Sequence, residues 1–141
     1  MTNPSPDAKI AIVLDASLPS GLAANTAAVL ALTLGSRIDS LIGGDLKDAD
    51  DSPHVGITTM PIPILTAEAK SVKDIRNRAV REHDNLLVVD FTDCAQQTRT
   101  YDDYSRLLAA ATDEQLAYIG IALYGPRKPI QRLTGSLALL R

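Results

Sequence analysis

The residues best suited to chemistry in this sequence surround its first turn. The apolar run 9–14 leads to Asp15, and a short turn then precedes Ser20, Gly21 and Asn25 at the start of a helix of small apolar residues. A turn that runs into a helix N-terminus presents free backbone N–H groups, which bind anions. We therefore expect Asp15, Ser20, Gly21 and Asn25 to bind a small or anionic ligand. The alternative is that they are turn, capping and structurally hydrogen-bonded residues.

Two further residues could activate water. His54 follows Pro53 in a turn that we expect to return to the sheet, where a histidine could act as a general acid or base. Asp93 follows the apolar segment 85–91, at the end of an expected strand. We therefore take His54 and Asp93 as the catalytic candidates. For His54 the alternative is a turn histidine that bonds to backbone.

The acidic segment around Asp48 raises the question of a metal site. It holds several aspartates and one histidine, but it has no EF-hand spacing, and a single histidine is a poor ligand set for a transition metal. We expect a solvated acidic loop, and neither a metal nor another cofactor. The lone Cys94 lies among carboxylates, which disfavour a thiolate, so we interpret it as a structural thiol.

Composition limits the class of protein. The chain has 141 residues, enough for one domain, and its net charge of −3 makes nucleic acid an unlikely partner. The basic residues of segment 67–82 are interleaved with acidic ones, which favours a solvated face over an RNA-binding patch. A single cysteine suits a reducing compartment, and no apolar run reaches the length of a membrane span. We therefore expect a cytoplasmic protein with no membrane partner, made of a flexible tail (1–7) and a single domain (8–141).

Strands alternate with helices along the chain, and this order predicts an α/β layered domain with a mostly parallel or mixed sheet. We expect strands at 9–14, 61–65, 85–91, 116–125 and 136–140, and helices at 20–34, 67–82, 100–111 and 126–133. Segment 36–60 is expected to be a long excursion with a short strand near 40–42. The first helix is apolar on nearly every face, so it should be buried on more than one side.

Local signals predict how these elements begin and end. Gly35 is expected to end the first helix, Thr66 to cap the second, and Thr100 to cap a helix whose inward side carries Tyr104 and Leu107. Segment 85–91 is apolar on both faces of the expected strand, which favours a central strand. The prolines of segment 61–65 restrict that strand to a sheet edge or to a strand start.

Two separated segments resemble type 2 peptidyl-tRNA hydrolases. The first is KIAIVL followed by an Ala-rich helix, and the second is the Gly125-Pro126 ending with its Leu-Thr-Gly at 133–135. The chain resembles more closely a bacterial branch of that superfamily, the "domain of unknown function two thousand" group, in LPSGLAAN at 18–25 and EQLAYIGIALYGP at 114–126. The resemblance implies a three-layer α/β/α fold with a four-stranded mixed sheet.

The catalytic pattern of those hydrolases is not reproduced. Active members have two lysines at the first turn, then a glutamine and a histidine in the helix, whereas this chain has Leu22, Ala24, Ala28 and Ala31 there. Aliphatic side chains cannot hold a phosphate or stabilise an oxyanion. We therefore expect a protein that binds a ligand without catalysis. The alternatives are a divergent hydrolase of an acyl or peptidyl ester, and a homodimeric interaction module with an exposed sheet edge.

Overall fold

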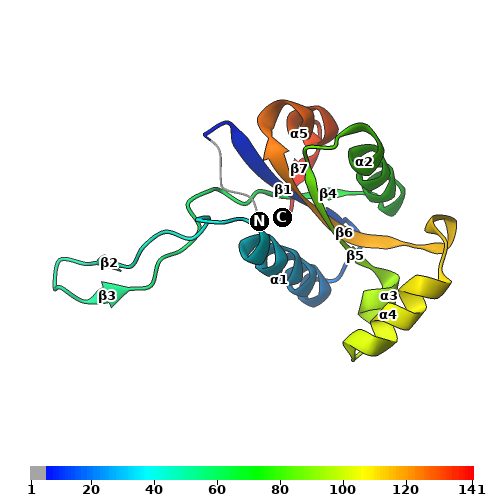
Figure 1. The fold of residues 1–141 in the computed structure, drawn as a ribbon, viewed down its shortest axis with the longest axis horizontal. Helices are drawn as coiled ribbons and strands as arrows, with labels where there is room; N and C mark the ends of the chain where they lie inside the picture. The colour runs from blue at the N-terminus through cyan, green and yellow to red at the C-terminus, as the bar shows by residue number, and fades with distance from the viewer. Residues whose placement is uncertain (1–5) are drawn as a thin grey trace.

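A five-stranded mixed sheet forms the centre of the protein in a computed structural model that describes residues 6–141 (Figure 1). The strand order is β5-β6-β1-β4-β7. Strand β1 pairs in parallel with β4, β6 is antiparallel to both β1 and β5, and β7 is antiparallel to β4. The strands are β1 (Ala8–Asp15), β4 (Ile64–Ala67), β5 (Leu87–Thr92), β6 (Tyr118–Pro126) and β7 (Ala138–Leu139).

Helices cover both faces of this sheet. Helix α1 (Ser20–Arg37) packs on one face, and α2 (Ala69–Glu82) and α5 (Arg127–Thr134) pack on the other. Strand β1 serves both layers, because Ile10, Ile12 and Leu14 face α1 while Ala11 and Val13 face the opposite core. Between β5 and β6 the chain forms α3 (Asp93–Gln97), α4 (Tyr101–Ala110) and the short 3₁₀ helix η1 (Asp113–Gln115). The predicted mixed α/β domain is confirmed.

One glycine lets α1 approach the sheet closely. A Cβ atom at Gly120 in β6 would lie 2.8 Å from Leu14 Cδ2 and 2.8 Å from Thr26 Cγ2. Thr26 is itself buried in α1, and its hydroxyl donates to the Leu22 carbonyl at 2.7 Å. The contact between α1 and the sheet therefore depends on the absence of a side chain at position 120.

Two expectations about the sheet need correction. The sheet has five strands rather than four, because β7 adds to the outer edge of β4, with Leu65 opposite Leu139 and Thr66 opposite Ala138. The strand expected at 85–91 is β5, which lies at the edge of the sheet and not at its centre. Its apolar residues are explained by helices on both of its faces. The prolines at 61 and 63 precede β4, which is consistent with a strand start.

Helix boundaries also differ from the local signals. Helix α1 continues through Gly35 to Arg37, and Thr66 lies within β4 while Glu68 occupies the N-cap of α2. The outward face of α1 is exposed, so the expectation that it is buried on more than one side is wrong for the single chain. The predicted cap of α4 is confirmed, because the Thr100 hydroxyl accepts from the Asp103 N–H at 3.1 Å. Leu107, predicted to point inward, is exposed.

The excursion at 36–60 forms a two-stranded arm that extends away from the sheet (Figure 1). We define the arm as residues 43–57; it contains β2 (Leu46–Lys47) and β3 (Pro53–His54). At its base a single bridge joins Ile42 and Thr58, in place of the strand expected at 40–42.

The expected tail at 1–7 lies mostly outside the described residues, which begin at residue 6. The Asp7 carbonyl accepts a hydrogen bond from the Arg127 N–H at 3.0 Å, so residue 7 is joined to the start of α5. Across residues 6–141, no helix combines the length and apolar character needed to cross a membrane.

Candidate functional site

The first predicted group of site residues lies around the turn between β1 and α1. Asp15 Oδ1 accepts from the Ser17 N–H at 2.9 Å and from the Ser17 hydroxyl at 2.8 Å. The carboxylate therefore stabilises the turn that follows β1. Ser20 and Gly21 form the first turn of α1, and Asn25 is exposed on the next turn. These residues therefore lie on one end of α1, but the Asp15 carboxylate is already engaged locally.

The N-terminus of α1 has no side-chain cap. Pro19 occupies the N-cap position and makes no side-chain hydrogen bond to the helix, and the first turn holds no acidic residue. Because the first N–H groups of a helix have no partner within the helix, those of Ser20 and Gly21 are available to an anion.

His54 lies on the arm, far from the other predicted residues. Its Nε2 atom is 2.8 Å from Asp48 Oδ2, and both side chains are exposed. The hydrogen bond from His54 lowers the pKa of Asp48 below its usual value, and the N–H groups of Ser52 and Asp50 add to this effect. Since the arm points away from the sheet (Figure 1), the structure does not bring His54 together with Asp15 or Asp93.

Asp93 begins α3, immediately after β5. Its Oδ1 atom accepts from the Cys94 N–H at 3.1 Å and from the Ala117 N–H at 3.3 Å, and its own N–H donates to the Ala117 carbonyl at 3.0 Å. The carboxylate thus fastens α3 to the segment that leads into β6. Next to it, Thr92 Oγ1 is buried and is the one buried side-chain polar atom without a partner in the described part of the chain.

A groove that the sequence did not predict lies beside the free edge of β5. It has a volume of about 410 Å³ and lies between α1 and the segment from α3 to α4. This volume is within the range of small-molecule sites. Its lining residues come from three separated segments: Val29 and Thr33 of α1; Val89, Asp90 and Phe91 of β5; and Ala95, Thr98, Arg99, Thr100, Tyr101 and Tyr104.

The groove combines an apolar body with one cationic residue. Val29, Val89 and Phe91 provide aliphatic and aromatic surface, and the rings of Tyr101 and Tyr104 meet edge to face at 5.6 Å. Arg99 forms no salt bridge with a carboxylate within 4.0 Å among residues 6–141. An unpaired guanidinium beside hydroxyl groups is suited to a carboxylate or phosphate, which it can hold by two parallel hydrogen bonds.

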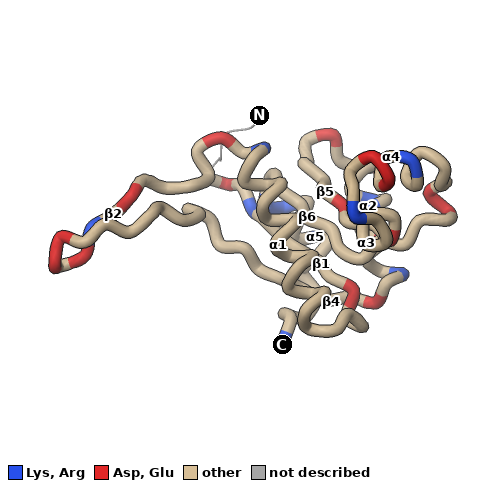
Figure 2. Tube along the Cα trace, turned by 90° about the horizontal axis from the view of Figure 1, so that it is seen from below, with Lys and Arg blue, Asp and Glu red and all other residues tan. Residues whose placement is uncertain are grey.

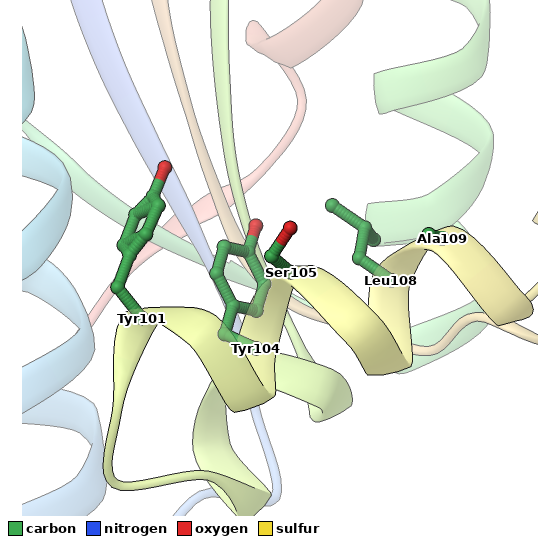
Figure 3. Close-up of a pocket in the computed structure, with 5 residues that line it drawn as sticks. All are labelled: Tyr101, Tyr104, Ser105, Leu108 and Ala109. Carbon is green, nitrogen blue, oxygen red and sulfur yellow. The ribbon is translucent and has the colours of Figure 1, made fainter.

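Helix α4 borders a second hollow that shares the two tyrosines. Figure 3 shows Tyr101, Tyr104 and Ser105 projecting from the same side of α4, with Leu108 one turn further along. This hollow has a volume of about 320 Å³. No residue of α4 is fully buried, and partial burial raises the pKa of Tyr104, with the charge of Asp90 adding to the effect. Helix α4 is therefore a lightly packed wall of the groove.

The basic residues of α2 were expected to face water, but Lys73 and Arg76 form hydrogen bonds with other segments of the same chain. Lys73 Nζ donates to the carbonyls of Asp113 and Leu116 at 2.6 and 2.8 Å. Arg76 Nε donates to Asp90 Oδ2 at 3.2 Å, and its guanidinium lies 5.0 Å above the ring centroid of Tyr118. These contacts hold η1 and β5 against α2, which leaves fewer cations for an RNA-binding face.

The structure is a mixed α/β fold with a ligand-sized groove at one sheet edge, and residues 6–141 hold no cluster of metal-binding side chains. The chain belongs to the family described as "Protein of unknown function (DUF2000)", whose model matches residues 8–141. A comparison with curated proteins finds no match. Among solved structures, it is similar to the protein of unknown function Atu0240 from Agrobacterium tumefaciens strain C58. That similarity has a TM-score of 0.87 and 19% identity, and it covers 97% of this chain and 100% of the other. At this identity, the similarity establishes the fold.

Proposed function

We propose that this protein binds a small amphipathic anion in the groove between α1, β5 and α4. The observation that carries the proposal is Arg99, a cation without a carboxylate partner at an apolar groove. The ligand would place an apolar or aromatic body against Val29, Phe91 and Tyr104. Its carboxylate or phosphate would meet Arg99 and the hydroxyl groups of Thr98 and Thr100.

The lining of the groove favours binding over catalysis. It includes no histidine, cysteine or lysine, and Asp90 is already paired with Arg76 on the α2 side of the sheet. General acid–base catalysis needs a group whose pKa lies near the working pH, and nucleophilic catalysis by a hydroxyl needs an adjacent base that activates it. The groove offers hydroxyl groups without an adjacent base, so binding is the function that its chemistry supports.

The experiment is a titration with phenylacetate and phenyl phosphate, followed by thermal shift and calorimetry. Benzyl alcohol, which has a similar aromatic ring but no charge, is the comparison ligand. Both anions should stabilise the folded protein, because a ligand that binds only the folded state raises its melting temperature. Arg99→Gln should weaken anion binding by about tenfold or more. Arg106→Gln is the matched control: Arg106 lies on α4 outside the groove lining and pairs only with Asp103. Equal losses in both variants would reject the assignment of Arg99.

A second candidate is an inorganic anion at the N-terminus of α1, with Ser20 and Gly21 as donors and Asp15 and Asn25 alongside. The missing cap favours it. A titration with phosphate, followed by amide NMR, should then shift the signals of Ser20 and Gly21 more than those of Thr98 and Arg99. The opposite pattern would exclude this site.

We also propose kinship with the type 2 peptidyl-tRNA hydrolases, in a cytoplasmic protein that has lost their chemistry. Leu22 and Ala28 support the loss, because they stand where the hydrolase pattern has polar groups. The single, buried Cys94 supports a reducing compartment. A purified sample should leave peptidyl-tRNA intact; cleavage that disappears in His54→Ala or Asp93→Asn would instead support the divergent hydrolase.

A further inference from the structure

We infer that the arm and the outward face of α1 form the interface of a homodimer, in which each arm lies against α1 of the partner. Five large apolar residues outside the ligand groove are exposed on these two elements: Leu22, Leu32, Leu46, Val55 and Ile57. Ile42 is also exposed, at the base of the arm. Exposed apolar patches of this size on soluble domains usually mark interaction sites.

Helix α1 has an outward face that is unlike that of a solvated helix. Its exposed positions include Leu22, Ala24, Ala28, Val29 and Leu32, and Leu32 is 77% exposed. No charged residue occurs between Ser20 and Ser36. A helix that is apolar all round is normally buried all round, yet the sheet covers only one side of α1. The uncovered side therefore lacks a partner within the chain.

The arm has a defined shape but no core of its own. At its base, the Gly43 N–H donates to the Ile57 carbonyl, and the Gly56 N–H donates to Asp45 Oδ1, both at 2.9 Å. The base is so narrow that a Cβ atom at Gly56 would lie 1.8 Å from the Gly43 carbonyl oxygen. Leu46, Val55 and Ile57 are nevertheless 72%, 82% and 77% exposed. An isolated hairpin is marginally stable in water, so these apolar side chains need a surface to pack on.

The dimensions and area fit a second copy of this chain. Helix α1 has 18 residues and is about 27 Å long at 1.5 Å per residue. Each side of the arm has about seven residues and reaches roughly 23 Å at 3.3 Å per residue. Leu46 pairs with His54, so Val55 and Ile57 lie on the other face of the arm. Val55 and Ile57, together with Leu22 and Leu32 of α1, expose roughly 280 Å² of apolar surface, taking about 100 Å² for a full aliphatic side chain. Since interfaces are about 60% apolar, this corresponds to roughly 470 Å² per subunit, or about 900 Å² in total, the size of a small interface.

The arm leaves the body beyond the C-terminal end of α1 and points away from it, so it cannot cover its own α1 (Figure 1). A twofold axis beyond the C-terminal end of α1 would place each arm against the outward face of the partner's α1. Such an isologous arrangement is closed and uses each surface once per subunit. Figure 2 shows acidic residues at the tip of the arm and a further acidic stretch part-way along it, where Asp45 accepts from the Gly56 N–H.

The test is analytical ultracentrifugation of the full chain and of three variants at about 100 μM, a concentration well above a micromolar Kd. The wild type should sediment as a dimer. Leu32→Lys on α1 and Val55→Lys on the arm should each sediment as a monomer. Val80→Lys is the matched control, because Val80 is 50% exposed but lies on α2, on the opposite face of the sheet, and this variant should stay dimeric.

All three substitutions replace side chains that are exposed in the single chain, so circular dichroism should show an unchanged fold. A monomeric wild type would overturn the inference. A dimer that survives both Leu32→Lys and Val55→Lys would also overturn it, because the interface would then lie elsewhere. If only Leu32→Lys dissociates the dimer, the helix face is retained and the role of the arm is rejected.

Discussion

Arg76 on α2 donates from Nε to Asp90 Oδ2 on β5 at 3.2 Å, and this pair joins the second helix to the edge strand that borders the groove. Both side chains are largely buried, at 26% and 22% exposure. The same guanidinium covers the ring of Tyr118, whose hydroxyl donates to Asp113 Oδ1 at 3.0 Å. Contacts on the α2 face of the sheet therefore fix the strand whose free edge borders the groove.

Arg76→Gln should destabilise the fold by about 1–2 kcal/mol, because it breaks a charge-assisted hydrogen bond and leaves a half-buried carboxylate unpaired. Arg78→Gln is the control. Arg78 lies on the same helix and makes only surface ion pairs of 3.8 and 3.9 Å, with Asp74 and Glu82, so its loss should change stability by less than about 0.5 kcal/mol. Urea denaturation measures both values. Similar losses in the two variants would contradict the structural role of Arg76.

Gly120→Ala should destabilise the protein by about 1–3 kcal/mol, because the added methyl group meets Leu14 and Thr26 at 2.8 Å in a fully packed layer. Gly35→Ala should do the reverse. Gly35 lies within α1, and a Cβ atom there has nothing within 4 Å, so alanine should stabilise the helix by about 0.5–1 kcal/mol. Thermal unfolding of the two variants compares these opposite signs. A stabilised Gly120→Ala variant would show that α1 is not pressed against β6.

The tip of the arm should loosen in acid. His54 lowers the pKa of Asp48 below 3.8, with the Ser52 and Asp50 N–H groups adding to the effect, so the folded arm favours the carboxylate. This contribution is fully present above about pH 4 and is lost as the pH falls through the folded-state pKa. Amide exchange at Asp50 and Ser52 should therefore accelerate as the pH falls below about 4, beyond the intrinsic pH dependence of exchange. Asp48→Asn should lack this step, and a step of equal size in that variant would assign the effect to another group.

Local patterns in the sequence were sufficient for most of the helices and strands but not for the position of each strand. Segment 85–91 is apolar on both faces because α1 and α2 cover β5, and this pattern is the same for a central strand and for a covered edge strand. Gly35 resembles a helix C-cap, yet the helix continues through it because Leu34 and Ile38 both bury their side chains in the core. Tertiary burial overrides the local preference here.

The groove could not be predicted in the same way, because its residues come from three segments that only the fold brings together. Tyr101 and Tyr104 are spaced as one face of a helix, and that pattern predicts a buried side, not a wall of a groove. Arg99 gave no signal of its own among the charged residues of the sequence. The first turn, which did give a signal, lies at the N-terminal end of α1, whereas the groove meets α1 at Val29 and Thr33.

The measurement that tests ligand binding in the groove most directly is a titration of the isotope-labelled protein with phenyl phosphate, followed by amide NMR. Binding in the groove should give saturable shifts at Val89, Phe91 and the segment 98–104, and these shifts should be lost in Arg99→Gln but not in Arg106→Gln. Shifts restricted to the turn at Ser20 and Gly21, or no saturable shift at all, would contradict it.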